Sequence, residues 1–414
     1  MRVFFSIITI LFSLHTFGQV EEINPAENIK TITFKGDTPE SQLPILRLGE
    51  YLVLEFDVLN GNEDDYYYEI KHYNYDWTPS VLVQSEYLQG FNEQRIRTWD
   101  NSFNTYQIYS HFILTIPNEQ TRAITKSGNY IITVYNEDDD IEFTRKFMVY
   151  EDIASVGVAI KRSRDVSDIK EKQSVDIAIN SSILRFNNPL QTIKTVIIQN
   201  NNLRTAIKNV KPQYILGNEL QYRYTKETSF YAGNEYLNFE NKDIRGANIG
   251  VQFIELKELY NSYLYRNILR ANRDYTYNPD INGNFLITAL DTDNPKIGAD
   301  YAQVHFTLEL NKLSKGQTVH VYGNFNNYAV DNTTKLTYFD DESTYEGKLL
   351  LKQGFYSYKY VIKNKDGSID ENAISGNFWQ TENNYKVLVY YRDLGARYDR
   401  IIGYGEGNSV DITN

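Results

Sequence analysis

The sequence predicts an all-β protein made of β-sandwich domains in series, and three observations support this fold class. Apolar residues alternate at period two in segments spread along the whole chain, which is typical of strands with one buried face. Aromatic residues, which favour strands, are abundant, with 35 tyrosines and 21 phenylalanines against 9 prolines and 2 methionines. Short segments rich in Asn, Asp and Gly separate the alternating runs and predict turns.

The beginning of the chain has the features of a secretory signal peptide, which predicts export. Arg2 is followed by an apolar run over residues 3–14 and by a polar stretch that ends at Gly18. The run is shorter than the roughly 20 residues of a permanent transmembrane helix, and no later segment comes closer. The chain has no cysteine, so a lipid-anchored form, disulfides, Cys-ligated metals and thiol catalysis are excluded. We therefore expect a soluble exported protein after removal of residues 1–18.

The charge balance indicates which partners the protein can bind. The formal net charge is −12, and the sequence pI is about 5.1. Nucleic acids and anionic membrane surfaces repel an acidic protein at long range. A protein or a neutral glycan is therefore the expected partner.

The first domain is expected over residues 19–152. The polar residues 136–140 predict a hairpin between its last two strands, and residues 127–129 predict the turn before it. In the last strand Arg145 shares the alternating positions with Phe143, Phe147 and Val149. The strands are predicted at residues 52–58, 66–70, 130–134 and 143–149.

The middle domain is expected over residues 153–298 and holds more irregular sequence, so long loops are expected there. Residues 254–265 place Leu256, Leu259, Tyr260 and Tyr263 at helical spacing, which makes this segment a candidate helix. The same residues favour a strand equally well. Strands are predicted at residues 156–160, 175–179 and 196–198.

The C-terminal domain and tail are expected over residues 299–414. Asn364-Lys365-Asp366-Gly367 is a strong hairpin signal, because the Asp-Gly pair tolerates the positive φ of a tight turn. The three domains are consistent with one immunoglobulin-like plan. Strands are predicted at residues 304–310, 319–321, 356–362 and 385–391.

The residue types that carry catalysis and metal binding form no recognisable motif. Beyond the signal peptide there are four histidines, and none forms a metal-binding pair at helical spacing. The sequence has no nucleophile elbow, P-loop or G-x-G-x-x-G motif. Acidic runs such as residues 137–140 are better explained as solvated turns than as calcium loops. We predict no catalytic residue, no metal site and no cofactor; a hydrolase without a sequence motif stays a third alternative.

Aromatic residues in predicted loops are the candidates for an interaction surface, because they can anchor a protein interface or stack on a sugar. Trp77 lies just ahead of Thr78-Pro79 and also fits a core position beside a turn. The interface candidates are Tyr73, Tyr75, Trp77, Tyr87, Phe325, Tyr328 and Trp379.

Residues 321–328, Val-Tyr-Gly-Asn-Phe-Asn-Asn-Tyr, are similar to a turn of the early-set immunoglobulin module found in glycogen-binding domains. The resemblance implies that the last domain has this module's framework. In that family a tryptophan stacks on the sugar where this chain has Tyr328, and the framework alone does not imply sugar binding. A periplasmic carbohydrate-binding module acting through Phe325, Tyr328 and Trp379 is therefore the alternative function.

Several stretches taken together resemble the type IX secretion system plug protein family, once known only as a domain of unknown function. They occur in the family's order over nearly the whole chain after the signal peptide. They lie at residues 68–72, 76–77, 86–91, 127–130, 144–147, 300–306, 322–328, 352–358, 381–383, 389–392 and 395–403.

This resemblance implies a non-enzymatic protein in the periplasm, at the inner face of the outer membrane. It would bind the periplasmic opening of the large outer-membrane β-barrel translocon and block the channel in the resting state. It would reach the membrane only through the translocon and would bind no nucleic acid. Such a plug needs rigidity, width and an interaction surface rather than an active site.

Overall fold

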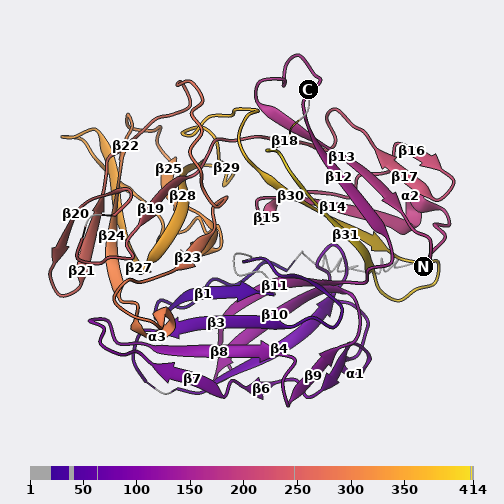
Figure 1. Cartoon of the computed structure of the whole chain (residues 1–414), viewed down its shortest axis with the longest axis horizontal. Coiled ribbons are helices and arrows are strands. Elements are labelled where there is room, and N and C mark those ends of the chain that lie inside the picture. The colour runs from indigo at the N-terminus through magenta and orange to yellow at the C-terminus, as the bar shows by residue number, and fades with distance from the viewer. Residues whose placement is uncertain (1–19, 37–41, 63, 247, 411, 413–414) are drawn as a thin grey trace, which may run out of the picture.

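The computed structural model describes residues 20–36, 42–62, 64–246, 248–410 and 412. The predicted signal peptide lies outside these residues. The described chain forms three β-rich units (Figure 1), with the first unit along the bottom of the view and the other two above it. The predicted all-β sandwich fold is confirmed.

The first unit is a sandwich of a four-stranded sheet, β1-β3-β8-β7, and a five-stranded sheet, β2-β11-β10-β4-β6, beside the small pair β5-β9. Its apolar residues fill one core between the two sheets, where Phe56, Tyr130 and Phe147 each have 0% exposed surface. The predicted β10–β11 hairpin is present. The elements are β1 (Ile29–Lys35), β2 (Ile45–Arg47), β3 (Leu52–Val58), β4 (Tyr66–Tyr73), α1 (Gln84–Tyr87), β5 (Leu88–Gly90), β6 (Gln94–Arg95), β7 (Thr98–Asn101), β8 (Ser110–Ile116), β9 (Thr121–Ile124), β10 (Gly128–Asn136) and β11 (Ile141–Tyr150).

The second unit combines two parts of the chain that are far apart in sequence. One sheet is β12-β13-β17-β16, with β18 paired to β13, and the other is β15-β14-β30-β31. The elements are β12 (Ser155–Arg162), β13 (Lys172–Asn180), α2 (Pro189–Thr192), β14 (Ile193–Gln199), β15 (Asn202–Lys208), β16 (Tyr214–Leu216), β17 (Glu219–Tyr222), β18 (Ser229–Tyr231), β30 (Asn384–Tyr391) and β31 (Arg400–Asn408).

The third unit lies between β18 and β30 in sequence and has two sheets around its own core. β28 pairs with β19, β23, β25 and β29, while the second sheet has the order β20-β21-β24-β27-β26, with β22 on β24. The elements are β19 (Leu237–Glu240), β20 (Val251–Leu256), β21 (Tyr260–Leu264), β22 (Asn267–Ile268), β23 (Phe285–Ile287), α3 (Pro295–Gly298), β24 (Tyr301–Glu309), β25 (Thr318–Tyr322), η1 (Asn324–Asn326), β26 (Thr337–Phe339), β27 (Thr344–Lys352), β28 (Gly354–Lys363) and β29 (Ile369–Asp370).

The last predicted strand forms, but not in the unit where we expected it. β30 pairs with β14 along residues 193–199, and Tyr385, Val387 and Val389 are buried in the core of the second unit. Local alternation predicts a strand and its buried face, but it carries no information about which distant strand becomes the neighbour. In place of the predicted boundary between residues 298 and 299, we propose that the third domain is inserted within the second. The second domain then consists of residues 153–231 and 384–410.

The interpretation of residues 254–265 as a helix is wrong, and the strand alternative is the one that forms. This segment forms the β20–β21 hairpin, which turns between Leu256 and Tyr260. Phe253 and Tyr263 stack across the pair with ring centroids 4.2 Å apart. The strand preference of these aromatic and branched residues outweighs their helical spacing. No helix within the described residues is long and apolar enough to span a membrane.

Candidate functional site

The predicted interface residues lie mostly inside the molecule. Tyr73, Trp77, Tyr87 and Tyr328 are buried, whereas Tyr75, Phe325 and Trp379 are partly exposed. The Tyr87 hydroxyl donates to the Ile70 carbonyl at 3.1 Å. The four buried residues therefore have no surface available to an external partner. Several of them lie instead at contacts between the units.

Trp77 and Tyr73 belong to the apolar interface between the first and second units. Trp77 is 3% exposed, and the Lys146 ammonium lies 4.7 Å from its ring centroid. Residues of β10 and β11 pack here against residues of β14, β30 and β31. The buried members of this cluster are Leu43, Tyr73, Trp77, Ile131, Met148, Val196, Ile198, Leu388, Tyr390 and Ile401.

Hydrogen bonds and an ion pair fix the register of the same interface. The Tyr390 hydroxyl donates to Asn129 Oδ1 at 2.7 Å, and both residues are buried. Arg400 donates to both carboxylate oxygens of Glu151, at 3.0 and 2.5 Å. Bidentate geometry makes this arginine–carboxylate contact directional as well as attractive. The first unit is thus held to the second by an apolar patch with specific polar contacts.

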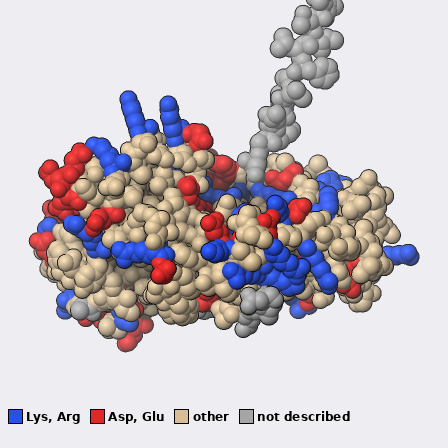
Figure 2. All heavy atoms as spheres, turned by 90° about the horizontal axis from the view of Figure 1, so that it is seen from above, with Lys and Arg blue, Asp and Glu red and all other residues tan. Residues whose placement is uncertain are grey.

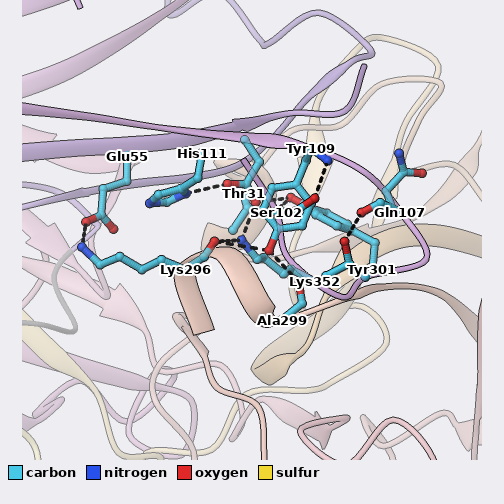
Figure 3. Close-up of polar contacts among 12 residues, drawn as sticks. Thr31, Glu55, Ser102, Gln107, Tyr109, His111, Lys296, Ala299, Tyr301 and Lys352 are labelled. Atoms are coloured by element: carbon cyan, nitrogen blue, oxygen red, sulfur yellow. Dashed lines mark hydrogen bonds and ion pairs between the residues drawn. The ribbon is translucent and has the colours of Figure 1, made fainter. Parts of the chain in front are cut away.

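A buried charge network joins the first unit to the third (Figure 3). Asp57 on β3 has 0% exposed surface, and its Oδ1 lies 2.6 Å from His111 Nδ1 on β8. Its Oδ2 accepts hydrogen bonds from Lys352 Nζ at 2.7 Å and from the Tyr301 hydroxyl at 2.6 Å. Both of these donors come from the third unit. Asp57 is therefore fully paired only while the two units are in contact.

The surroundings of Lys352 complete the network. Lys352 is 1% exposed, donates to the Lys296 carbonyl at 2.6 Å and lies 4.1 Å from the ring centroid of Tyr109. Burial alone would raise the pKa of Asp57, but Lys352 and His111 outweigh that effect and hold this pKa below its usual value. The Asp57 carboxylate is thus a charged buried group.

Two further contacts surround this charge network. The Lys296 ammonium pairs with Glu55 at 2.5 Å, and Glu55 is itself 6% exposed. Asp300 accepts hydrogen bonds from the backbone of Tyr106 at 2.6 Å and of Gln107 at 3.1 Å. The interface therefore combines side-chain ion pairs with hydrogen bonds that fix the loop before β8.

The second and third units contact each other through the end of β25 and the turn that follows it. The Tyr328 hydroxyl donates to the Asn200 carbonyl at 2.8 Å, and Asn202 donates to the Tyr322 hydroxyl at 2.9 Å. A polar cleft of about 870 Å³ lies beside these contacts. Tyr328, which takes the place of the sugar-stacking tryptophan, is 3% exposed and has no face free for a sugar. The alternative function as a carbohydrate-binding module is therefore not supported by this residue.

Three of the histidines beyond the signal peptide contact residues that explain them structurally. His305 Nε2 lies 2.9 Å from Asn261 Oδ1, and His320 lies between Thr318 and Thr334. Asp57 and His111 form an acid–histidine pair, but Nε2 of His111 is buried without a hydrogen-bond partner. In the part of the chain that the structure describes, no three metal-ligand side chains come together.

Buried histidines predict acid sensitivity. His72 is 3% exposed, and burial lowers its pKa to about 4, although a hydrogen bond to the Ser127 carbonyl opposes this shift. The unfolded chain binds this proton first, at its pKa near 6.5, so stability falls as pH drops from about 6.5 to 4. We expect a loss of about 3 kcal/mol from this group. Thermal unfolding of the wild type and of His72→Gln between pH 7.5 and 4.5 measures it.

The matched comparison is His305→Gln, because burial also lowers the pKa of His305 but this side chain is only partly buried. The His72→Gln protein should lose the least stability on acidification, and the His305→Gln protein should fall between it and the wild type. Parallel pH profiles for wild type and His72→Gln would contradict the assignment.

Sequence reasoning missed the charge network at Asp57. Glu55 and Asp57 occupy the alternate face of the β3 pattern, and acidic residues are depleted in strands. Two carboxylates in the interior of a strand were the one local signal that this face meets another part of the protein. Their partner Lys352 lies almost three hundred residues further along the chain, and no pattern links the two.

Comparison with known proteins identifies the family. The family described as "Type 9 secretion system plug protein 1st domain" matches residues 29–151, which coincide with the first unit. The chain belongs to the type IX secretion system plug protein family. No curated protein matches the chain.

Solved structures extend the likeness beyond the family's first domain. A hypothetical protein from Parabacteroides merdae ATCC 43184 is 34% identical, with 94% of this chain and 98% of that chain covered and a TM-score of 0.89. Trypsin-activated alpha-2-macroglobulin from Escherichia coli is 9% identical, with 95% of this chain and 29% of that chain covered and a TM-score of 0.18. That second similarity is too low to inform the fold. The fold of this chain is thus shared with that hypothetical protein over nearly the whole length of both chains.

Membership places this plug-family protein in the type IX secretion system, in the cell envelope. The contacts described above are then the internal joints of a secretion-system component.

Proposed function

We propose that this protein binds the periplasmic opening of the type IX outer-membrane translocon and blocks it in the resting state, without catalysing a reaction. Family membership supports an association with the type IX secretion system. The mutual contacts among the three units support a role in blocking the channel. The first unit contacts the second through Trp77 and Tyr390, the first contacts the third through Asp57 and Lys352, and the second contacts the third through Tyr328. Each pair of units is held by buried groups.

The triangular arrangement is the observation that carries the proposal. Two units joined by one interface can rotate about it, but three units in mutual contact can hinge only if another interface opens. Opening the Asp57–Lys352 contact would leave a buried carboxylate without its cation, which is costly. A wide body that resists hinging is what steric closure of a large channel requires.

Surface charge bears on how the body meets its partner. Figure 2 shows that Lys and Arg side chains gather near the middle and right of one face, while acidic side chains are more frequent toward its left edge. The protein therefore has basic surface despite its net charge of −12. Attraction between charged surfaces weakens with salt, so the proposed association is expected to be tighter at low ionic strength.

Purification from detergent-solubilised outer membranes through a C-terminal affinity tag tests the proposal. We expect a very large β-barrel protein to co-purify, with higher yield at 50 mM than at 500 mM salt. The same tag on an unrelated periplasmic protein is the control for non-specific capture. Recovery of the protein without any barrel partner at both salt concentrations would contradict the proposal.

A further inference from the structure

A cavity of about 390 Å³ lies where the first unit meets the third, beside the charge network at Asp57, to which it is linked by the hydrogen bond of 2.6 Å between Thr31 and Tyr301. Its walls come from β1 and the segment leading into it, from η1 and the turn that follows, and from β11, β23, β27 and β28. The apolar side chains of the wall are Pro25, Ile29, Ile32, Phe285, Phe325, Ala329, Leu349, Leu350, Leu351 and Tyr356. This volume falls within the range of small-molecule sites.

Two cationic side chains, Lys30 and Arg145, line this cavity, and Arg145 is the one without a carboxylate partner among the described residues. It lies on β11 at the alternating position between Phe143 and Phe147, which belong to the core of the first unit. Arg145 lines the cavity and is only 8% exposed. Among the described residues its guanidinium makes one hydrogen bond, from Nη1 to the carbonyl of Thr144 at 2.7 Å, and it lies 5.4 Å from the ring centroid of Phe143. No ion pair joins it to any carboxylate of the described chain.

The nearest acidic influence on Arg145 is already in use. Glu22 acts on the guanidinium electrostatically, but its two carboxylate oxygens accept hydrogen bonds from the Lys146 backbone at 2.7 Å and from Asn327 at 3.1 Å. Burial lowers the pKa of Arg145, against the opposing effect of Glu22. Buried arginines are almost always paired, because an uncompensated buried charge is costly.

The acidic residues that line the cavity also have other partners. Asp331 accepts a hydrogen bond from Asn24 at 3.1 Å, and both Asp331 and Glu27 act on Lys30. Arg145 is therefore a cation of this cavity that has no carboxylate partner among the described residues. Aliphatic and aromatic side chains form much of the wall around it. A ligand that suits this site has one anionic group and an apolar body.

We propose that this cavity binds an amphipathic carboxylate, with the carboxylate on Arg145 and its aliphatic or aromatic body against Ile29, Phe325 and Leu351. A carboxylate matches the paired N–H groups of a guanidinium. An apolar body gains by burial in proportion to its length until the cavity is filled. The site is independent of the proposed function and does not require the translocon.

Titration of the purified protein with octanoate, decanoate and dodecanoate tests the proposal. We expect affinity to rise about fourfold for each added methylene while the cavity has room. Dodecyltrimethylammonium, which has the same chain with a cationic head, should bind at least tenfold more weakly than dodecanoate. Equal binding of the two detergent-like probes, or no binding of any carboxylate at 1 mM, would overturn the proposal.

Two variants assign the binding to Arg145. Arg145→Met should weaken dodecanoate binding at least tenfold, while Arg145→Lys, which keeps the charge, should retain part of it. The matched control is Arg162→Met on β12, because the Arg162 guanidinium also donates to a carbonyl, that of Ile169, and lies far from the cavity wall in sequence and unit. Unchanged dodecanoate affinity in Arg145→Met would contradict the assignment.

Thermal unfolding shows whether the Arg145→Met protein is folded and whether dodecanoate stabilises it. Because Arg145 lacks a carboxylate partner, ligand-free Arg145→Met should melt at the same temperature as the wild type or higher. Dodecanoate should raise the melting temperature of the wild type but not of this variant. A lower melting temperature for Arg145→Met, with equal stabilisation of both proteins by dodecanoate, would show that Arg145 is only structural.

Discussion

Replacing Lys352 with methionine is expected to lower the free energy of unfolding by about 3–5 kcal/mol. The substitution keeps most of the side-chain volume but leaves the carboxylate of Asp57, with 0% exposed surface, without its cation. The remaining donors, Tyr301 and His111, do not supply a permanent positive charge. Denaturant unfolding followed by tyrosine and tryptophan fluorescence measures the loss.

Two comparisons separate this ion pair from a general effect of removing lysine. Lys312→Met breaks an exposed pair with Asp340 and should leave the free energy of unfolding close to that of the wild type. The double variant Asp57→Asn with Lys352→Met removes both charges and should recover more than half of the loss. A loss below 1 kcal/mol for Lys352→Met would show that this contact does not hold the units together.

Replacing Trp77 with alanine is expected to cost about 3–5 kcal/mol. The indole is 3% exposed and packs in the apolar interface between the first and second units. Its removal leaves a cavity there and also removes the contact with the Lys146 ammonium. Because the side chain fills the joint between two units, the variant should become more sensitive to proteolysis near residues 151–155.

Trp379→Ala is the matched control for this prediction. Trp379 is partly exposed, and the Arg162 guanidinium lies 4.3 Å from its ring centroid. Its removal should cost about 1 kcal/mol, mainly from the lost cation–π contact. Similar losses for the two tryptophans, with no change in proteolysis for Trp77→Ala, would contradict a joint at Trp77.

The local structure of this protein could be predicted from its sequence to a large extent. The runs at residues 52–58, 130–134 and 356–362 form strands whose alternating apolar residues are buried as expected, although residues of the opposite face, such as Asp57, Ile131 and Ser357, are buried as well. The Asn364–Gly367 turn forms with Gly367 at φ 88°. These features depend on neighbours in sequence, which a pattern of period two records directly.

Contacts between distant segments could not be predicted in the same way. The pairing of β30 with β14, and of Asp57 with Lys352, joins residues about 190 and 295 positions apart. Aromatic residues in predicted loops were interpreted as an interaction surface for a partner, but Trp77 and Tyr328 are buried between units of the same chain. A tyrosine in a predicted loop does not reveal whether it meets another protein or another part of its own.

The family resemblance supplied what residue patterns could not. Residues 68–72, 127–130 and 144–147 all lie in the first unit, which the family match covers. Arg145 was visible in the sequence as a charged residue at a core position of a strand. Its meaning required the structure, because only the structure shows the cavity and the absence of a carboxylate partner among the described residues.

Permeability of the cell envelope tests the central claim most directly. Cells that lack this protein should admit a large hydrophilic antibiotic or dye that wild-type cells exclude, and the wild-type gene should restore exclusion. The Lys352→Met variant, with one joint weakened, should restore it less completely at equal protein level. Unchanged permeability in cells that lack the protein but retain the translocon would contradict the account of this protein as a plug.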